Sequence, residues 1–287
     1  MTETGPNPVQ NPPVSPCARD AREGCGGSLC GVGVDAELVR RFEKLAADER
    51  FRHRICSPRE ADHLASQAQP ALAFCASFCC KEAFFKALGE AYAFPECECF
   101  QQPGASGLEL VISPRLRERH GLAAARARFH ERFLGERGEC VVEVHLFRGQ
   151  AGRDDAARTP EPAASAAAGL VRSRLETLAV AGVEAERRQI EERFFSPREI
   201  GDLGTRRVQS LAGFLTLKLA LAALWIDAGC AAAAGPGDFE LSHHVSGAPR
   251  LVAAPEGVVL SDVFVSISHT RQWAYGLAAI GGRGPAG

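Results

Sequence analysis

Residues 74–89 read FCASFCCKEAFFKALG, and residues 210–225 read SLAGFLTLKLALAALW. Both runs are apolar over about four turns of helix, and Lys81 of the first run has a counterpart in Lys218 of the second. We expect each run to form a long helix packed against a sheet. The pair is one of several matches between the two halves of the chain, and these matches together decide the fold.

Two further pairs of blocks precede the two helical runs. GVGVDAE (31–37) and CSPRE (56–60) stand before the first run, and AGVEAER (181–187) and FSPRE (195–199) stand before the second. SPRE suits a helix start, because Ser can cap the helix, Pro fits its first turn and Glu completes a capping box. Three matched blocks in one order indicate an internal duplication.

Around these blocks each half mixes helices with mainly antiparallel strands, which is an α+β pattern. A strand should end near Asp35, and a helix should follow over 38–47, where Leu38, Phe42 and Leu45 are helically spaced. Further strands are expected at 97–100, 108–112, 125–130 and 141–147 in the first half, and at 239–245, 250–253, 263–267 and 274–280 in the second.

Two stretches without apolar periodicity divide the chain. Residues 1–28 are rich in Pro, Gly and polar residues and are predicted to form a disordered tail. Residues 149–169, GQAGRDDAARTPEPAASAAAG, have the composition of a linker. The two halves are therefore expected at 29–148 and 170–281, each a normal size for a small domain.

Composition narrows the class of protein. Of 287 residues 46% are hydrophobic and 24% charged, and the net charge of -2 favours neither nucleic-acid binding nor a polybasic membrane anchor. The longest apolar stretch, 211–234, is interrupted by Lys218 and Asp227, so we expect no membrane span. The N-terminus lacks the pattern of a secretory signal, which predicts a cytoplasmic location.

Eleven cysteines raise the question of disulfides or a metal site. The chain is long enough to form a core without disulfides, and the expected compartment is reducing. There is no CxxC pair; Cys79 and Cys80 are adjacent, and Cys97 and Cys99 are two apart. We interpret the cysteines as small buried hydrophobic residues with some exposed thiols.

The first candidate site lies on the helical run 74–89. Cys75, Cys79, Glu82 and Lys86 follow at i, i+4, i+7 and i+11, so they share one face of a helix. Glu82 then lies beside an apolar stripe, where a carboxylate is costly unless water, a cation or a metal reaches it. The alternative is an ordinary Glu82–Lys86 ion pair on a solvated edge.

The matching helical run in the second half helps to decide between these two interpretations of Glu82. Leu219 stands where Glu82 would be in the second half, and Ala223 stands where Lys86 would be. The fold therefore tolerates an apolar residue in place of Glu82, which argues against a packing role for this carboxylate.

The second candidate is the pair Asp35 and Glu37 at the end of GVGVDAE. On an extended backbone both carboxylates point to one side. One or two carboxylates plus substrate phosphates suffice to hold Mg²⁺. The alternative is an N-cap Asp with a Glu in the first helical turn. The repeat keeps acids here, as Glu184 and Glu186.

The third candidate is VSISHT, 265–270. Ser266 and Ser268 share one face of the expected strand, and His269 stands at its end. This group can donate several hydrogen bonds to phosphate oxygens, or it is a polar strand end with a capping His. The first half, with the acids, and the second half, with Ser-x-Ser-His, are complementary, so one composite site between the halves would use every group.

These motifs resemble those of the 4'-phosphopantetheinyl transferases. FCCKEAFFKALG is similar to the pattern of the bacterial holo-[acyl-carrier-protein] synthases, GVGVD resembles their G-x-D element, and SISHT resembles their final strand. The resemblance covers both halves and implies a tandem fusion of two synthase-like halves, which form a pseudo-dimer and need no second chain. In the family's usual pseudo-dimer the Ser-x-Ser-His half comes first, whereas here it comes second.

The resemblance also implies an activity. The family moves the 4'-phosphopantetheine arm of coenzyme A to a serine of an apo acyl carrier protein and requires Mg²⁺. Asp35, Glu37 and Glu82 match the metal ligands, and the place corresponding to them in the second half should be inactive. The residues that match the coenzyme A contacts and the catalytic groups are Lys81, Lys86, Ser266, Ser268 and His269.

Several alternatives stay open. Either Glu82 or Lys86, directly or through water, could accept the serine proton. A cluster of arginines, Arg40, Arg41, Arg50, Arg52 and Arg54, is either a docking surface for an acidic carrier protein or a solvated face. The main competing hypothesis is a degenerate homologue that binds coenzyme A or a carrier protein without chemistry. The carrier could belong to fatty acid, polyketide or peptide synthesis.

Overall fold

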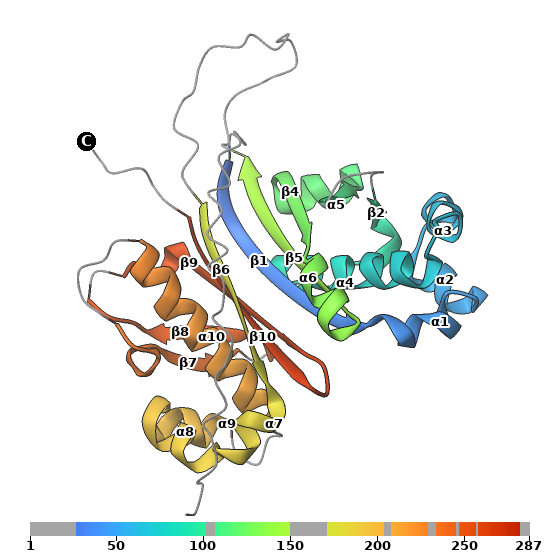
Figure 1. The fold of residues 1–287 in the computed structure, drawn as a ribbon. Helices are drawn as coiled ribbons and strands as arrows, with labels where there is room; N and C mark the ends of the chain where they lie inside the picture. Colours follow the sequence, from blue (N-terminus) through green and yellow to red (C-terminus); the bar gives the residue numbers. More distant parts are fainter. Residues whose placement is uncertain are drawn as a thin grey trace, which may run out of the picture.

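The structure is a computed structural model that describes residues 27–101, 107–149, 171–203, 208–228, 234–244, 247–256 and 258–281. The expected tail over 1–28 and linker over 149–169 lie almost entirely outside these residues. The described part mixes helices with antiparallel sheets, which confirms the predicted α+β class (Figure 1).

The first half is a five-stranded antiparallel sheet in the order β1-β5-β4-β3-β2. The long helix α4, Pro70–Leu88, covers one face of it; Pro70 lies in its first turn, and Gly89 ends it with a φ of 74° that suits glycine. The other elements are β1 Gly27–Leu38, α1 Phe42–Leu45, α2 Glu49–Ile55, α3 Pro58–Ala65, β2 Cys97–Gln101, β3 Gly107–Ile112, α5 Pro114–His120, β4 Leu122–Phe129, α6 Glu131–Arg137 and β5 Glu139–Gly149.

The second half is a three-stranded antiparallel sheet in the order β6-β10-β9, with a separate ribbon of β7 and β8. Helix α10, Val208–Asp227, is long and apolar enough to cross a membrane, but it is mostly buried as the core helix of this half. The other elements are β6 Val171–Ala179, α7 Val180–Ala185, α8 Arg187–Phe194, α9 Pro197–Leu203, β7 Glu240–His243, β8 Pro249–Ala253, β9 Val263–His269 and β10 Trp273–Gly281.

The two sheets pack face to face, with α4 and α10 on their outer sides (Figure 1). A buried cluster joins them: Val34 of β1 and Val141 of β5 pack with Tyr275 and Leu277 of β10. Glu139 of the first half accepts hydrogen bonds from Tyr275 and, at 2.6 Å, from Thr270 Oγ1. The interface between the halves thus has a hydrophobic core, and the carboxylate of Glu139 buried in it is hydrogen-bonded to Tyr275 and Thr270.

Strand β1 lies against the backbone of α4, and its glycines make this possible. A Cβ atom on Gly33 would lie 1.8 Å from the carbonyl oxygen of Ala83, and one on Gly31 would lie 2.1 Å from that of Ala87. Any larger residue would push the strand off the helix. The close approach places the residues that follow Gly33 beside the face of α4 that carries Glu82 and Lys86.

The predicted long helices and terminal strands are confirmed with small shifts of their ends, but three local predictions are wrong. The helix expected over 38–47 is a 3-10 turn, Val39–Arg41, followed by the short α1. Helices α5 and α6 were not expected. Residues 181–187, AGVEAER, lie in α7 and the start of α8, whereas GVGVDAE lies in strand β1.

The strand that corresponds to β1 is therefore β6. β1 is the edge strand in the order β1-β5-β4, and β6 is the edge strand in the order β6-β10-β9. The residues that leave them make the same hydrogen bond: Val39 N donates to Gly138 O at 3.1 Å, and Val180 N donates to Gln272 O at 2.8 Å. This correspondence aligns Asp35 with Glu176, not with Glu184 as the sequence motifs suggested.

Candidate active site between the two halves

Asp35 lies near the end of β1 and is 8% exposed. Its Oδ1 atom accepts a hydrogen bond from Lys86 Nζ of α4 at 2.8 Å. The same ammonium donates to the carbonyl oxygens of Val34 at 3.0 Å and of Ile267 at 3.2 Å. Because Ile267 belongs to β9, Lys86 bridges the helix, strand β1 and the second half of the chain.

Ser266 and Ser268 of β9 join the edge of β1. Ser266 Oγ accepts from Val34 N at 3.1 Å, and Ser268 Oγ accepts from Ala36 N at 3.2 Å while donating to Asp35 Oδ1 at 3.0 Å. The two serines are 3% and 6% exposed. Their hydroxyls satisfy the open edge of β1 and fix the orientation of Asp35, and their expected role as ligands of coenzyme A phosphates stays a prediction.

Glu82 and Glu37 complete a cluster of carboxylates with Asp35. Burial raises the pKa of Glu82, the charges of Asp35 and Glu37 raise it further, and Lys86 lowers it. The side chain of Glu37 is 20% exposed and forms an ion pair with Arg41. The structure therefore places the three nominated acids in one neighbourhood, but among the described residues their carboxylate oxygens do not all lie within 4.8 Å of one another, as ligands of one ion would.

His269 ends β9 at the exposed rim of this cluster. Partial burial lowers the pKa of His269, and the positive charge of Lys86 lowers it further, with Asp35 acting in the opposite direction. At neutral pH the ring is accordingly neutral and can donate one hydrogen bond. The predicted groups Asp35, Glu37, Glu82, Lys86 and His269 thus share one site, assembled from both halves.

Lys81 does not belong to this site, although the sequence nominated it for coenzyme A. It is 0% exposed, and its ammonium contacts Glu60 Oε2 at 2.6 Å and Phe94 O at 3.2 Å. Glu60 in turn accepts from Ser77 Oγ at 2.7 Å and Cys99 N at 2.9 Å. A fully buried ammonium with these acceptors cannot reach a phosphate at the surface, so Lys81 has a structural role.

The second half repeats this buried pair. Lys218 Nζ lies 2.8 Å from the carboxylate of Glu199 and donates to Phe194 O at 2.7 Å. Glu60 and Glu199 are the glutamates of the two SPRE blocks. The sequence argument assigned both to capping boxes and missed their pairing with the helix lysines. A buried lysine at the same place in both helices was the signal, because such a charge requires a partner.

The acidic cluster has no complete copy in the second half. Glu176 occupies the place of Asp35, but Leu178 stands at that of Glu37, Leu219 at that of Glu82 and Ala223 at that of Lys86. Glu184 and Glu186 are exposed on helices away from this position. Two of the three carboxylates and the bridging lysine are thus replaced by apolar residues.

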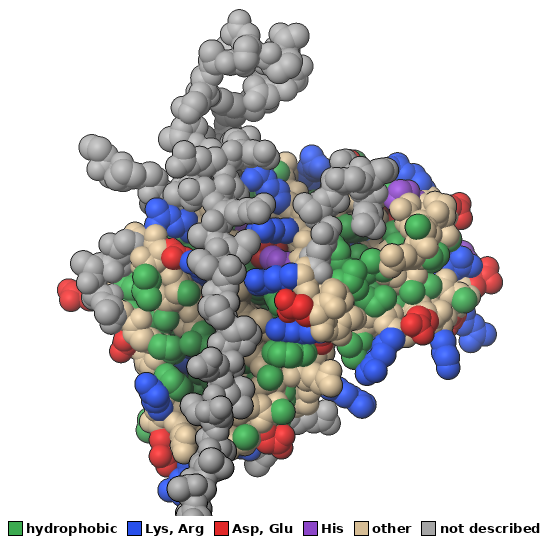
Figure 2. All heavy atoms as spheres, in the orientation of Figure 1, with side chains coloured by type: hydrophobic (Ala, Val, Ile, Leu, Met, Phe, Trp, Pro, Cys, Tyr) green, Lys and Arg blue, Asp and Glu red, His purple; other side chains and the backbone are tan. Residues whose placement is uncertain are grey.

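Positive charge gathers near the site at the end of the first half formed by α1 and α2. Figure 2 shows Lys and Arg side chains projecting there, with Asp and Glu among them. Arg52 is partly buried, whereas the other nominated arginines are exposed: Arg40, Arg41, Arg50 and Arg54. Carrier docking on this surface stays a prediction.

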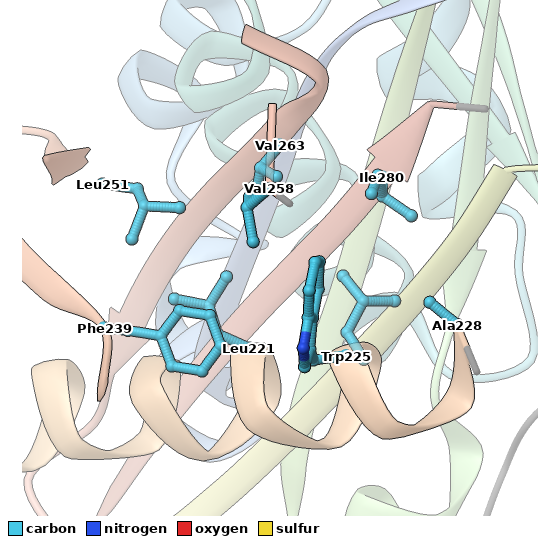
Figure 3. A pocket seen from close by; sticks show the side chains of 9 residues that line it. Leu221, Trp225, Ala228, Phe239, Leu251, Val258, Val263 and Ile280 are labelled. Atoms are coloured by element: carbon cyan, nitrogen blue, oxygen red, sulfur yellow. The ribbon is translucent and has the colours of Figure 1, made fainter. Parts of the chain in front are cut away.

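A separate hollow in the second half is apolar throughout (Figure 3). It lies between α10 and the sheet, at the end of β9 that is far from His269. Its lining residues are Leu221, Leu224, Trp225, Ala228, Phe239, Leu251, Val258, Val263 and Ile280. With no ionisable group among them, this hollow offers no acid-base chemistry.

Comparisons with known proteins bear on the first half. The family model of the 4'-phosphopantetheinyl transferase superfamily matches residues 31–132. A curated relative, the holo-[acyl-carrier-protein] synthase of Syntrophus aciditrophicus, is 38% identical over 61 residues, which are 21% of this chain and 48% of the relative. The chain thus spans about half the length of the curated relative that it matches.

Solved structures give similar matches. The holo-ACP-synthase of Plasmodium yoelii superposes with a TM-score of 0.37 at 16% identity, covering 44% of this chain and 100% of that one. The holo-(acyl-carrier-protein) synthase of Bacillus anthracis, in complex with CoA (3',5'-ADP), gives 0.34 at 19% identity, covering 42% and 99%. The expected resemblance to the superfamily is confirmed by the family model for residues 31–132, which contain every nominated acid and Lys86.

Proposed function

We propose that this chain transfers the 4'-phosphopantetheine group of coenzyme A to a serine of an apo acyl carrier protein. The reaction takes place at one composite site between two synthase-like halves that act as a pseudo-dimer within one chain. The proposal joins the family match over residues 31–132 to the site geometry. The curated relative carries the name of this activity, holo-[acyl-carrier-protein] synthase.

One observation carries the proposal: Asp35 is held by both halves at once. Lys86 of the matched first half and Ser268 of the second half donate to the same carboxylate oxygen, at 2.8 and 3.0 Å. A carboxylate fixed in this way, beside two further acids and a neutral histidine, has the features of a preorganised site for phosphoryl chemistry.

The donor set has the chemistry of a site for a hard divalent cation, but its carboxylate oxygens do not all lie within 4.8 Å of one another, so the side chains would have to move closer to hold one ion. Asp35, Glu37 and Glu82 gather like charges that raise the pKa of Glu82, and oxygen ligands of this kind suit Mg²⁺. These three residues would hold the ion. When bound, Mg²⁺ would neutralise charge on the pyrophosphate of coenzyme A and on the departing adenosine 3',5'-bisphosphate.

The chain's own residues supply the remaining steps. His269 lies on the rim, where it can donate a hydrogen bond to the phosphates of coenzyme A, whereas the three donors of the Lys86 ammonium are taken by Val34, Asp35 and Ile267, so Lys86 contributes its positive charge. Glu82, directly or through a water molecule, can accept the proton of the attacking serine hydroxyl. Ser268 keeps Asp35 oriented.

Mass spectrometry of a carrier protein tests the proposal. The chain, coenzyme A, Mg²⁺ and an apo acyl carrier protein are mixed, and a mass gain of one phosphopantetheine group is expected. Glu82→Ala should lower the rate by at least about 100-fold. Leu219→Ala, the matched change on α10, should lower stability and leave the rate per folded molecule unchanged.

Two results would contradict this proposal. If both variants lose activity equally while folded, the acids of the first half have no special role. If no carrier is modified by folded protein that still binds coenzyme A, the chain is a binding protein without this chemistry.

A further inference from the structure

Three cysteines form a compact cluster behind the candidate active site. Cys75 and Cys79 lie one turn apart on α4, and Cys140 lies on β5, which the helix covers. Their sulfur atoms all lie within 4.8 Å of one another, and all three residues are 0% exposed. Among the described residues, no other three Cys, His, Asp or Glu side chains bring their ligand atoms together in this way.

We propose that this cluster binds one thiophilic metal ion of the Zn²⁺ type through three thiolates. Sulfur atoms that bind one ion at about 2.3 Å lie about 4 Å apart. Side-chain rotations that move each sulfur atom by less than about 1 Å would therefore bring all three within binding distance of one ion. Soft thiolates select Zn²⁺ and similar ions over Mg²⁺. The site is therefore chemically distinct from the oxygen cluster of Asp35, Glu37 and Glu82.

The surroundings of the three sulfurs differ from a purely apolar core. Cys75 Sγ donates to Glu37 O at 3.9 Å, and Cys79 Sγ donates to Cys140 O at 3.6 Å. Burial raises the pKa values of the Cys75 and Cys79 thiols, and the carbonyls accept from their protons, so a metal ion must displace those protons when it binds. The positive charge of Arg41 interacts with both thiols and offsets part of the cost of burying thiolates.

Cys80 of the same helix serves as a control for the cluster of Cys75, Cys79 and Cys140. Cys80 is equally buried on α4 but lies beside Cys99 of β2, on the other side of the helix. Cys97 lies near this pair as well, but the three sulfur atoms do not all lie within 4.8 Å of one another. A metal at Cys75, Cys79 and Cys140 would instead tie α4 to β5 and lie next to the main chain of Glu37. The ion would brace the strand that carries the active-site acids, and this inference does not depend on the transfer reaction.

Metal content of the full-length, reduced protein tests the site. After loading with Zn²⁺ and dialysis, we expect one tightly held equivalent and a higher melting temperature. Cys79→Ala and Cys140→Ala should each lose that equivalent and the thermal shift. Cys80→Ala, the matched control, should keep both. Circular dichroism checks that every variant is folded.

X-ray absorption of the zinc-loaded wild-type protein tests the ligands without any variant. Three sulfur neighbours around the ion are expected. A shell of oxygen and nitrogen alone would place the ion at the carboxylates and overturn the inference. Failure of the reduced wild-type protein to retain Zn²⁺, or its retention by Cys140→Ala at the wild-type level, would overturn it as well.

Discussion

Single atoms decide the geometry of the site. Asp35 Oδ1 receives hydrogen bonds from two halves of the chain, and Ser268 Oγ both donates to it and accepts from Ala36 N. Each such bond contributes about 1 kcal/mol to stability, and leaving a buried partner unpaired costs about 1–3 kcal/mol. The carboxylate is thus positioned by the fold before any substrate arrives.

The buried pair of Lys81 and Glu60 leads to a prediction about stability. Lys81→Met should lower the free energy of unfolding by about 3–5 kcal/mol, because Glu60 would stay buried as an unpaired charge. Adding Glu60→Gln should restore much of this loss, since the amide oxygen can still accept from Ser77 and Cys99. Urea unfolding of the single and double variants measures the difference. A fully stable Lys81→Met protein that no longer binds coenzyme A would contradict the structural role.

The residues of the candidate site were easier to nominate than the residues that position them. Asp35, Glu37, Glu82, Lys86 and His269 were nominated from motifs that resemble those of a known family, because spacing alone left a structural alternative open for each. The serines could not be distinguished from phosphate ligands, because their partners in β1 lie more than 230 residues away in the chain. The prediction of small buried cysteines is confirmed, because seven of the eight described ones are buried. The grouping of Cys75, Cys79 and Cys140 was not expected, because its members come from a helix turn and a strand and have no CxxC spacing.

At the scale of elements, the contact between β1 and α4 determines where the acids of the candidate site lie. Two glycines let the strand lie directly on the helix backbone, which places the acids of both elements together. The long helices were predictable from their apolar runs. The match between AGVEAER and GVGVDAE was wrong, although the two blocks have a similar composition. In the structure AGVEAER begins after β6 has ended. Helix α5 starts at Ser113–Pro114, the same Ser-Pro signal as SPRE, and was overlooked.

Gly33→Ala should disrupt that contact. The new Cβ would lie 1.8 Å from Ala83 O, so we expect a loss of about 1–3 kcal/mol in unfolding free energy and a further loss of activity as Asp35 moves. Gly182→Ala is the matched control, because this helical glycine has no atom within 4 Å of its added Cβ. It should gain up to about 1 kcal/mol. Thermal unfolding compares the two, and equal stability of both variants would refute the close-packing argument.

At the scale of the whole molecule, the two halves share the arrangement β1-β5-β4 and β6-β10-β9 but carry different chemical groups. The first keeps three carboxylates and Lys86, and the second keeps the Ser-x-Ser-His strand that faces them. The positions that correspond to the acids in the second half carry Leu178 and Leu219. We therefore expect one active site per chain, completed by both halves.

The most direct test of that composite site is the rate of phosphopantetheine transfer by His269→Ala. This change lies in the second half, outside the residues that match the family model. We expect a loss on the order of 100-fold with unchanged folding, while His63→Ala, on α3 and outside the arginine cluster, keeps the wild-type rate. A His269→Ala protein as active as the wild type would contradict the claim that the second half completes the site.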